Sequence, residues 1–290
     1  MGGAEGQVTI MEKTSPGTLY LVATPIGNLR DVAPRAADTL RDADFIAAED
    51  TRVTRKLLEH LNIKKPLVSY REHNRRESGE RIVERILAGE SCALVTDAGT
   101  PGISDPGEDL VKMCAEAGLD MKTIPGPCAA VAALSVSGLP SGRFTFEGFL
   151  STAGKSRYEH LSELKTGKRT MVFYEAPHKL LRTLNDMLAI FGDRRISISR
   201  EITKIYEETL RLSLSEAVAH FTQTAPRGEF VLVIEGAKPS PAPAMSLDLA
   251  VEKAISYIDK GASVKDAVKK ASVETGVPRN ALYSAVVKPK

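Results

Sequence analysis

Short apolar runs alternate with segments of helical period up to Ser137, and this alternation restricts the fold more than any other feature of the chain. Five runs have the length and composition of buried strands: Leu19–Ala23, Phe45–Ala48, Leu67–Tyr70, Cys92–Thr96 and Met121–Ile124. The segments between them repeat apolar residues at helical spacing: Pro34–Arg41, Thr51–Leu61, Arg76–Gly89 and Glu108–Ala117. Because parallel strands need crossover helices, this series predicts a parallel sheet covered by helices.

The sequence pattern changes at Gly138–Gly142. Predicted strands become more frequent after this point, which indicates a second α/β domain. These strands are expected at Phe144–Phe149, Thr170–Tyr174, Arg195–Ser199, Glu208–Leu214 and Phe230–Ile234. The string KPSPAPA predicts a stiff linker before a helical tail. The expected division is a flexible leader 1–16, a first domain 17–141, a second domain 142–237, a linker 238–245 and a tail 246–290.

Three loops rich in glycine and proline follow predicted strands of the first domain. They read TPIGNL at Thr24–Leu29, TDAGTPGISDPG at Thr96–Gly107, and PGP at Pro125–Pro127. Glycine lets the backbone approach a ligand closely, while proline stiffens the loop. Ligands of open α/β sheets bind at the carboxyl ends of strands, so the three loops predict one shared site. The first loop lacks the GxGxxG spacing of nicotinamide-binding folds, which argues against a dehydrogenase.

Seven strings occur in order along the chain: TPIGNLRD from Thr24, AAEDTR from Ala47, TDAGTPGISDPG from Thr96, PGPCA from Pro125, FYEAPHKL from Phe173, REITKIYEE from Arg200 and GEFVLVIEG from Gly228. By these strings the chain resembles the tetrapyrrole methylase superfamily, most closely its branch that methylates small-subunit ribosomal RNA. The resemblance implies a two-lobed α/β fold, with a parallel sheet in the first domain and a mixed sheet in the second. It also implies S-adenosylmethionine as cofactor and a homodimer. The implied methyl acceptor is the 2′-hydroxyl of a cytidine in the decoding region of 16S ribosomal RNA, free or in the small ribosomal subunit.

The resemblance also assigns candidate site residues. Those expected to line the cofactor are Pro25, Gly99, Pro101, Ile103, Ser104, Cys128, Ala129, Tyr174 and Glu229. Tetrapyrrole-modifying relatives usually carry Gly-Asp-Pro where this chain has Gly99, Thr100 and Pro101, so a contact from that aspartate is not carried over.

Methyl transfer to a ribose hydroxyl requires alignment with the methyl group and removal of a proton. The groups that could accept or steer that proton are Glu49, Asp50, Glu201 and Lys204. A positioned base contributes roughly 10²- to 10⁴-fold to the rate. Each of these four side chains could instead form a structural salt bridge, and the sequence does not separate the two roles.

Charge is informative only locally. The chain has 39 Lys and Arg against 37 Asp and Glu, so it lacks a general basic signature for nucleic acid. The segment Ser246–Lys290 contains eight basic and five acidic residues, so it carries a local excess of positive charge. Two amphipathic helices are expected there, with a capping box at Ser263 and Asp266, and a third helix follows Gly276 and Pro278. This helix-turn-helix-like tail could contact RNA or form a small packing bundle.

Other patterns restrict the remaining function classes. The three cysteines are odd in number and form no CxxC pair, which favours buried thiols in a reducing cytoplasm, and no metal site is indicated. No segment has the apolar length to span a membrane.

The string GFLSTAGKS lacks P-loop spacing and is expected to form a mobile basic loop with Lys155 and Arg157, or a solvated hairpin. Two rival functions stay open: C-methylation of a tetrapyrrole ring, and non-catalytic RNA binding.

Overall fold

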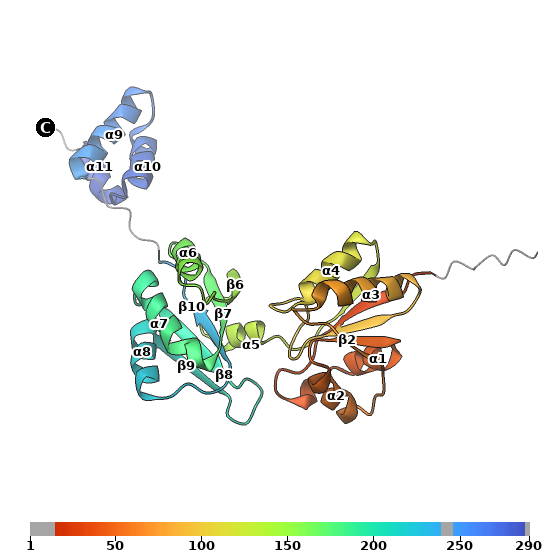
Figure 1. The fold of residues 1–290 in the computed structure, drawn as a ribbon. Coiled ribbons are helices and arrows are strands. Elements are labelled where there is room, and N and C mark those ends of the chain that lie inside the picture. The colour runs from red at the N-terminus through yellow and green to blue at the C-terminus, as the bar shows by residue number, and fades with distance from the viewer. Residues whose placement is uncertain (1–14, 239–245, 288–290) are drawn as a thin grey trace, which may run out of the picture. The chain divides into compact units, whose positions relative to one another are not determined.

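The computed structural model describes residues 15–238 and 246–287, and the chain divides into two compact units, one up to Gly236 and one from Ala237 (Figure 1). The expected leader 1–16 and linker 238–245 lie largely outside the described residues. The first unit contains two sheets of five strands each. None of the described helices is long and apolar enough to cross a membrane.

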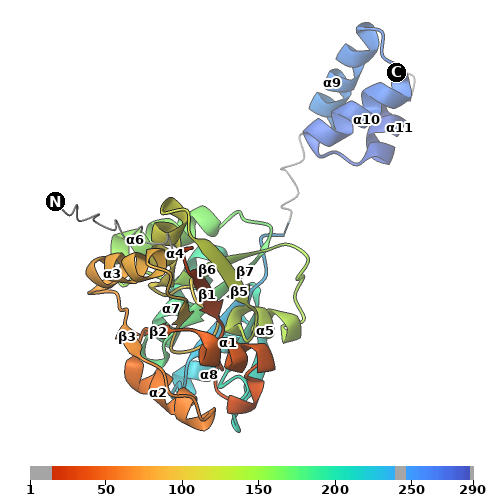
Figure 2. The ribbon, with the colours of Figure 1, turned by 90° about the vertical axis from the view of Figure 1, so that its right-hand side faces the viewer.

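The first sheet is parallel throughout, as the strand and helix alternation predicts. Its strands are β1 (Thr18–Val22), β2 (Phe45–Ala48), β3 (Leu67–Ser69), β4 (Cys92–Val95) and β5 (Asp120–Ile124), in the order β3-β2-β4-β1-β5. Its helices are α1 (Pro34–Asp42), α2 (Thr51–His60), α3 (Arg75–Leu87) and α4 (Gly107–Glu116), with a 3₁₀ turn at Leu29–Asp31. Helices α1 and α2 pack on one face of the sheet and α3 and α4 on the other (Figure 2).

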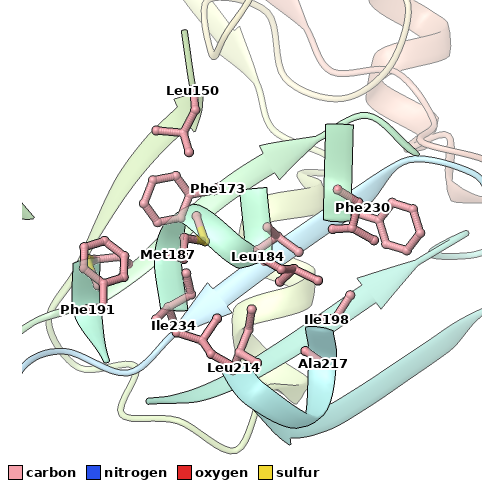
Figure 3. Close-up of a cluster of buried hydrophobic side chains, with 14 of the residues drawn as sticks. Leu150, Phe173, Leu184, Met187, Phe191, Ile198, Leu214, Ala217, Phe230 and Ile234 are labelled. Atoms are coloured by element: carbon pink, nitrogen blue, oxygen red, sulfur yellow. The ribbon is translucent and has the colours of Figure 1, made fainter. Parts of the chain in front are cut away.

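The second sheet is mixed. Its strands are β6 (Phe144–Phe149), β7 (Thr170–Glu175), β8 (Arg195–Arg200), β9 (Glu208–Ser213) and β10 (Phe230–Ile234), in the order β6-β7-β10-β8-β9. Only β6 and β7 pair in parallel, and the other neighbours are antiparallel. Helices α6 (Gly154–Leu164), α7 (Pro177–Phe191) and α8 (Leu214–Gln223) cover one face, where Phe173, Leu184, Met187 and Leu214 are buried (Figure 3). The small-residue helix α5 (Ala129–Val136) packs on the opposite face.

The second unit is a bundle of α9 (Leu247–Asp259), α10 (Val264–Thr275) and α11 (Arg279–Val287). The hydroxyl of Ser263 accepts a hydrogen bond of 3.2 Å from the Asp266 N–H and so caps α10. Gly276 ends the same helix with a φ of +70°, a left-handed conformation that glycine adopts without strain. A small core of alanine, valine and leucine, including Ala254, Val268 and Leu282, holds the three helices together.

The prediction of a mobile basic loop at Lys155 and Arg157 is wrong. Both residues lie on helix α6, and Arg157 is only 5% exposed. Its guanidinium donates hydrogen bonds of 2.6 Å to the Asp186 carboxylate and to the Thr183 hydroxyl, both on α7. A buried guanidinium needs such partners, and Arg157 therefore joins α6 to α7 instead of facing solvent.

Candidate active site

The three glycine- and proline-rich loops meet at the carboxyl ends of β1, β4 and β5. Thr24 and Gly99 exchange two backbone hydrogen bonds, of 2.8 and 3.1 Å, which join the first loop to the second. The Thr100 hydroxyl donates to the Pro127 carbonyl at 3.0 Å, which joins the second loop to the third. Gly99 has a φ of +88°, where a side chain would strain the backbone. The loops therefore form one cross-linked surface of exposed peptide groups.

Asp105 fixes the shape of the central loop. Its carboxylate accepts backbone hydrogen bonds from Gly102 (3.0 Å), Ile103 (3.2 Å) and Gly107 (2.7 Å). Burial nevertheless raises the pKa of Asp105, because removing the charged form from water outweighs these three hydrogen bonds. The next residue on the N-terminal side, Ser104, has a φ of +62°, so this part of the loop is held in a conformation that few side chains adopt.

A pocket of about 310 Å³ opens beside these loops and takes its walls from both lobes of the first unit. The first lobe and the start of α5 contribute Ile26, Glu49, Asp97, Gly99, Ile103, Ser104, Cys128 and Ala129. The second lobe contributes Phe149, Tyr174, Glu175, Glu201, Lys204 and Glu229. The lining combines apolar side chains with many charged and polar ones, and the volume lies at the lower end of the usual range for small-molecule sites.

Glu49 and Asp97 place two carboxylates on the first-lobe wall. The Glu49 carboxylate accepts hydrogen bonds from the Thr96 hydroxyl at 2.7 Å and from the Asp97 N–H at 3.3 Å. Burial, and then repulsion from Glu49, raises the pKa of Asp97. Two acidic groups this close favour a positively charged ligand, whose charge would relieve their repulsion.

Asp50 has a different environment although it follows Glu49 directly. Its carboxylate caps α2 by accepting the Arg52 N–H at 2.8 Å, and it pairs with the guanidinium groups of Arg52 (2.6 Å) and Arg71 (3.3 Å). These contacts, above all those with Arg52, hold the pKa of Asp50 well below its usual range. Asp50 reaches the site only through its backbone N–H, which donates to Asp97 at 2.9 Å.

An ion pair forms the opposite wall. The Lys204 ammonium lies 3.0 Å from the Glu201 carboxylate, and both side chains line the pocket. They belong to the loop between β8 and β9, in which Glu201 and Thr203 have positive φ angles of 50° and 70°. The pair presents a hydrogen-bond acceptor and a cation from the second lobe to whatever occupies the pocket.

Comparison with known proteins identifies the family. Residues 18–218 match the family of Tetrapyrrole (Corrin/Porphyrin) Methylases. A protein of Synechocystis sp., "Ribosomal RNA small subunit methyltransferase I", is 48% identical over 268 residues, covering 92% of this chain and 96% of the relative. Proteins of the same name from Bacillus subtilis and Escherichia coli O157:H7 are 45% and 41% identical, covering 96% and 93% of this chain and 97% and 94% of their own. The chain belongs to the ribosomal RNA small subunit methyltransferase I family. It is a methyltransferase, and the methyl donor of its wider family is S-adenosylmethionine.

Solved structures with the same fold have more distant sequences. A uroporphyrin-III C-methyltransferase from Thermus thermophilus is 20% identical with a TM-score of 0.55, over 75% of this chain and 94% of its own. A diphthine synthase is 14% identical with a TM-score of 0.57, over 76% of this chain and 90% of its own. The two-lobed architecture expected from the resemblance is therefore confirmed for this methyltransferase.

Most of the residues that the sequence assigned to the site surround the pocket. Seven of the expected cofactor residues line it: Gly99, Ile103, Ser104, Cys128, Ala129, Tyr174 and Glu229. Pro101 is buried within its loop and is not among the lining residues, and Pro25 lines a neighbouring hollow that shares Ile26 with the pocket. Of the expected catalytic groups, Glu49, Glu201 and Lys204 line the pocket and Asp50 does not.

Sequence reasoning missed three carboxylates that line the pocket: Asp97, Asp105 and Glu175. Asp105 could have been found from the string SDPG, because an aspartate before Pro-Gly often accepts nearby backbone N–H groups. Glu175 lies at the carboxyl end of β7, is 2% exposed and lines the pocket. It accepts hydrogen bonds from the Ala176 N–H at 2.9 Å and from the Thr183 hydroxyl. Its only signal was its position directly after Tyr174, at the end of a predicted strand.

Among the described residues, no group of three or more His, Cys, Asp or Glu side chains has an arrangement suited to a metal ion. His178 is exposed at the start of α7.

Proposed function

We propose that this methyltransferase transfers a methyl group from S-adenosylmethionine to the 2′-hydroxyl of a cytidine in the decoding region of 16S ribosomal RNA. The observation that carries the proposal is the pocket in which three cross-linked glycine- and proline-rich loops face the Glu201–Lys204 pair. The name shared by relatives that are 41% to 48% identical supports ribosomal RNA of the small subunit as the substrate.

The chemistry of the pocket lining supports S-adenosylmethionine as its ligand. Its peptide groups around Gly99 can approach a ligand closely, and Ile103 and Phe149 offer apolar surface to an adenine ring. Glu49 and Asp97 offer negative charge to a cationic ligand, and the pKa of Asp97 is raised by burial first and by repulsion from Glu49 second. When bound, the cofactor supplies a methyl group on a positively charged sulfur, which is already a good electrophile.

The residues of this chain then have to align a ribose hydroxyl and remove its proton. Glu201 and Glu49 are the carboxylates that could accept the proton, one from each lobe, and the Lys204 ammonium could hold the acceptor oxygen or orient Glu201. Asp50 would act only by fixing Asp97, because its carboxylate is engaged by two guanidinium groups.

The helical tail is proposed to bind the RNA. On α10 and α11, Lys265, Arg279, Asn280 and Tyr283 surround one hollow, a mixture of cationic, amide and aromatic groups that suits phosphates and bases. We further propose that the enzyme acts as a homodimer in the cytoplasm, as the family resemblance and a ribosomal substrate imply.

Mass-spectrometric mapping of ribose methylation tests the proposal on small-subunit RNA from cells with and without the protein. We expect one cytidine of the decoding region to lose its 2′-O-methyl group when the protein is absent, and a substrate with 2′-deoxycytidine there to accept no methyl group. A methyl group on the base would contradict the proposed acceptor, and transfer to a tetrapyrrole instead of RNA would favour the rival activity.

A further inference from the structure

The loop between β8 and β9 exposes two adjacent apolar side chains at the rim of the active site. Ile205 is 94% exposed and Tyr206 is 76% exposed, which places them among the most exposed large apolar side chains of the described residues. Single exposed apolar residues are common on protein surfaces, but this adjacent pair lies beside a ligand pocket, where it offers apolar and aromatic surface to a partner.

This loop has a defined conformation. The Lys204 N–H donates to the Glu201 carbonyl at 2.9 Å, and the Thr203 N–H donates to the Glu207 carboxylate at 2.7 Å. These hydrogen bonds hold Glu201 and Thr203 at positive φ angles, a conformation that persists only where the surroundings enforce it. The loop backbone that carries Tyr206 is therefore ordered before a partner binds, which reduces the entropy cost of binding.

Tyr206 forms one wall of a second hollow, of about 520 Å³, which we call the Tyr206 hollow. Its lining residues are Arg200, Glu201, Tyr206, Thr224, Ala225, Arg227 and Gly228. Glu201 lines both this hollow and the main pocket, so the two cavities share one side chain as a wall. A molecule that places one group near Glu201 in the main pocket could continue directly into the hollow.

The charges around the Tyr206 hollow leave one cation in excess. Arg200 is paired with Glu208 at 2.7 Å, and Glu201 is paired with Lys204 at 3.0 Å. Within the described residues, Arg227 makes no hydrogen bond or ion pair. The hollow thus combines an aromatic ring with an available guanidinium group, and it lies next to the proposed methyl-transfer site.

We infer that the Tyr206 hollow binds a nucleotide that neighbours the methylated one, with its base stacked on Tyr206 and its phosphate bound by Arg227. Stacking on an aromatic side chain and a charge-assisted phosphate contact are the two interactions that proteins use to bind single-stranded RNA. Ile205 would pack against the unstacked strand beside this base. The inference rests on the proposed function, since it requires RNA at the main pocket.

Single-turnover methylation of small ribosomal subunits from cells lacking the enzyme tests this inference, with half-saturating subunit concentration and maximal rate measured separately. Tyr206→Ala should raise the half-saturating concentration about 5- to 160-fold, the range for loss of one base–aromatic stack. Tyr206→Phe should behave like the unmodified enzyme, because the ring is retained. Arg227→Met should lower the slope of log affinity against log salt by about one. Tyr158→Ala, which removes a 64% exposed tyrosine that lines neither cavity, is the matched control.

Three outcomes would overturn the inference in distinguishable ways. If the unmodified enzyme is active while Tyr206→Ala and Arg227→Met keep its half-saturating concentration and salt slope, the hollow does not bind RNA and the proposed function stands. If the unmodified enzyme transfers no methyl group to the subunits, the proposed function fails and takes this inference with it. If Tyr206→Ala converts a dimer to a monomer in sedimentation without changing RNA affinity, the hollow is an interface between two copies of the chain.

Discussion

The phenolic oxygen of Tyr174 accepts a hydrogen bond of 3.1 Å from the backbone N–H of Ala130. Tyr174 ends the parallel pairing of β7 with β6, and Ala130 lies in the first turn of α5, where backbone N–H groups have no partner within the helix. This bond therefore attaches the start of α5 to the second sheet at the wall of the pocket. Burial raises the pKa of Tyr174 to about 12, so its hydroxyl stays protonated at neutral pH.

We expect Tyr174→Phe to lower the free energy of unfolding of the first unit by about 1–3 kcal/mol, because the buried Ala130 N–H loses its acceptor. Cofactor affinity should also fall, since the preceding residue, Ala129, lines the pocket. Urea unfolding and calorimetric titration with S-adenosylmethionine measure the two effects. Tyr158→Phe removes an exposed hydroxyl and serves as the control, and equal behaviour of the two variants would contradict the role of this hydrogen bond.

Gly99→Ala should abolish most cofactor binding while the chain remains folded. The added Cβ would have room, 3.5 Å from the nearest atom of Ile26, but alanine at a φ of +88° is strained. A strained residue of this kind costs about 1–3 kcal/mol, and the loop that lines the pocket would shift to relieve it. Gly118→Ala is the matched control, because Gly118 also has a positive φ, has open space where a Cβ would lie, and is outside the pocket. Unchanged cofactor affinity in folded Gly99→Ala would place the cofactor elsewhere.

Asp105→Asn should change how stability depends on pH. The pKa of Asp105 is raised in the folded protein, so the folded state holds this proton more tightly than the unfolded state does. Stability from this group is therefore present below the ordinary pKa of 3.8 and is lost as pH rises through the folded value. The unfolding free energy of the unmodified protein minus that of Asp105→Asn should fall with rising pH, measured by urea unfolding from roughly pH 4 to 7. A difference that grows with pH would mean that the three backbone N–H groups outweigh burial.

The strands and most helices follow from the sequence because a strand that is buried on both faces of its sheet has an uninterrupted apolar run. Phe45–Ala48 and Phe230–Ile234 begin and end where the apolar pattern predicts. The meeting of the three loops also follows, since the carboxyl ends of neighbouring parallel strands lie at one edge of the sheet. Local composition was therefore sufficient for the architecture and for the general position of the pocket.

Roles that depend on distant partners could not be predicted in this way. Arg157 resembles a surface cation in the sequence, and only the packing of α6 on α7 brings it to Asp186, 29 residues away. Glu49 and Asp50 are adjacent in the sequence, yet one faces the pocket and the other faces Arg52 and Arg71. The direction of a side chain at the end of a strand and its choice of ion-pair partner depend on tertiary packing. The sequence alone therefore could not decide which of the four candidate residues accepts the proton.

Deletion of Ser246–Lys290 should leave cofactor affinity unchanged, because every residue that lines the pocket lies in the first compact unit. RNA affinity should fall, and the slope of log affinity against log salt should decrease by roughly 0.7–0.9 for each phosphate that the tail neutralises. Fluorescence anisotropy with decoding-region RNA at several salt concentrations measures both quantities. Substitution of Lys265 and Arg279 by Met in the intact chain is the milder test of the same surface. Equal affinities and equal slopes for intact and truncated proteins would show that the tail only packs.

Loss of the proton acceptor should slow the chemical step without weakening cofactor binding. A ribose hydroxyl is a poor nucleophile at neutral pH, so removal of a genuine base should reduce the single-turnover rate roughly 10²- to 10⁴-fold. We expect at least one of Glu201→Gln, Lys204→Met and Glu49→Gln to behave in this way, because these side chains line the pocket. Asp50→Asn should have the smallest effect on rate of the four candidates, because its carboxylate faces Arg52 and Arg71.

Rapid-quench assays with saturating S-adenosylmethionine separate this chemical step from product release, and calorimetry verifies that each variant still binds the cofactor. Glu159→Gln, at an exposed position of α6 outside the pocket, controls for the general effect of removing a carboxylate. If all four variants keep near-normal single-turnover rates, solvent takes the proton and the enzyme works by alignment alone. In that case the function of the Glu201–Lys204 pair would be to position the ribose, and the variants should instead raise the half-saturating RNA concentration.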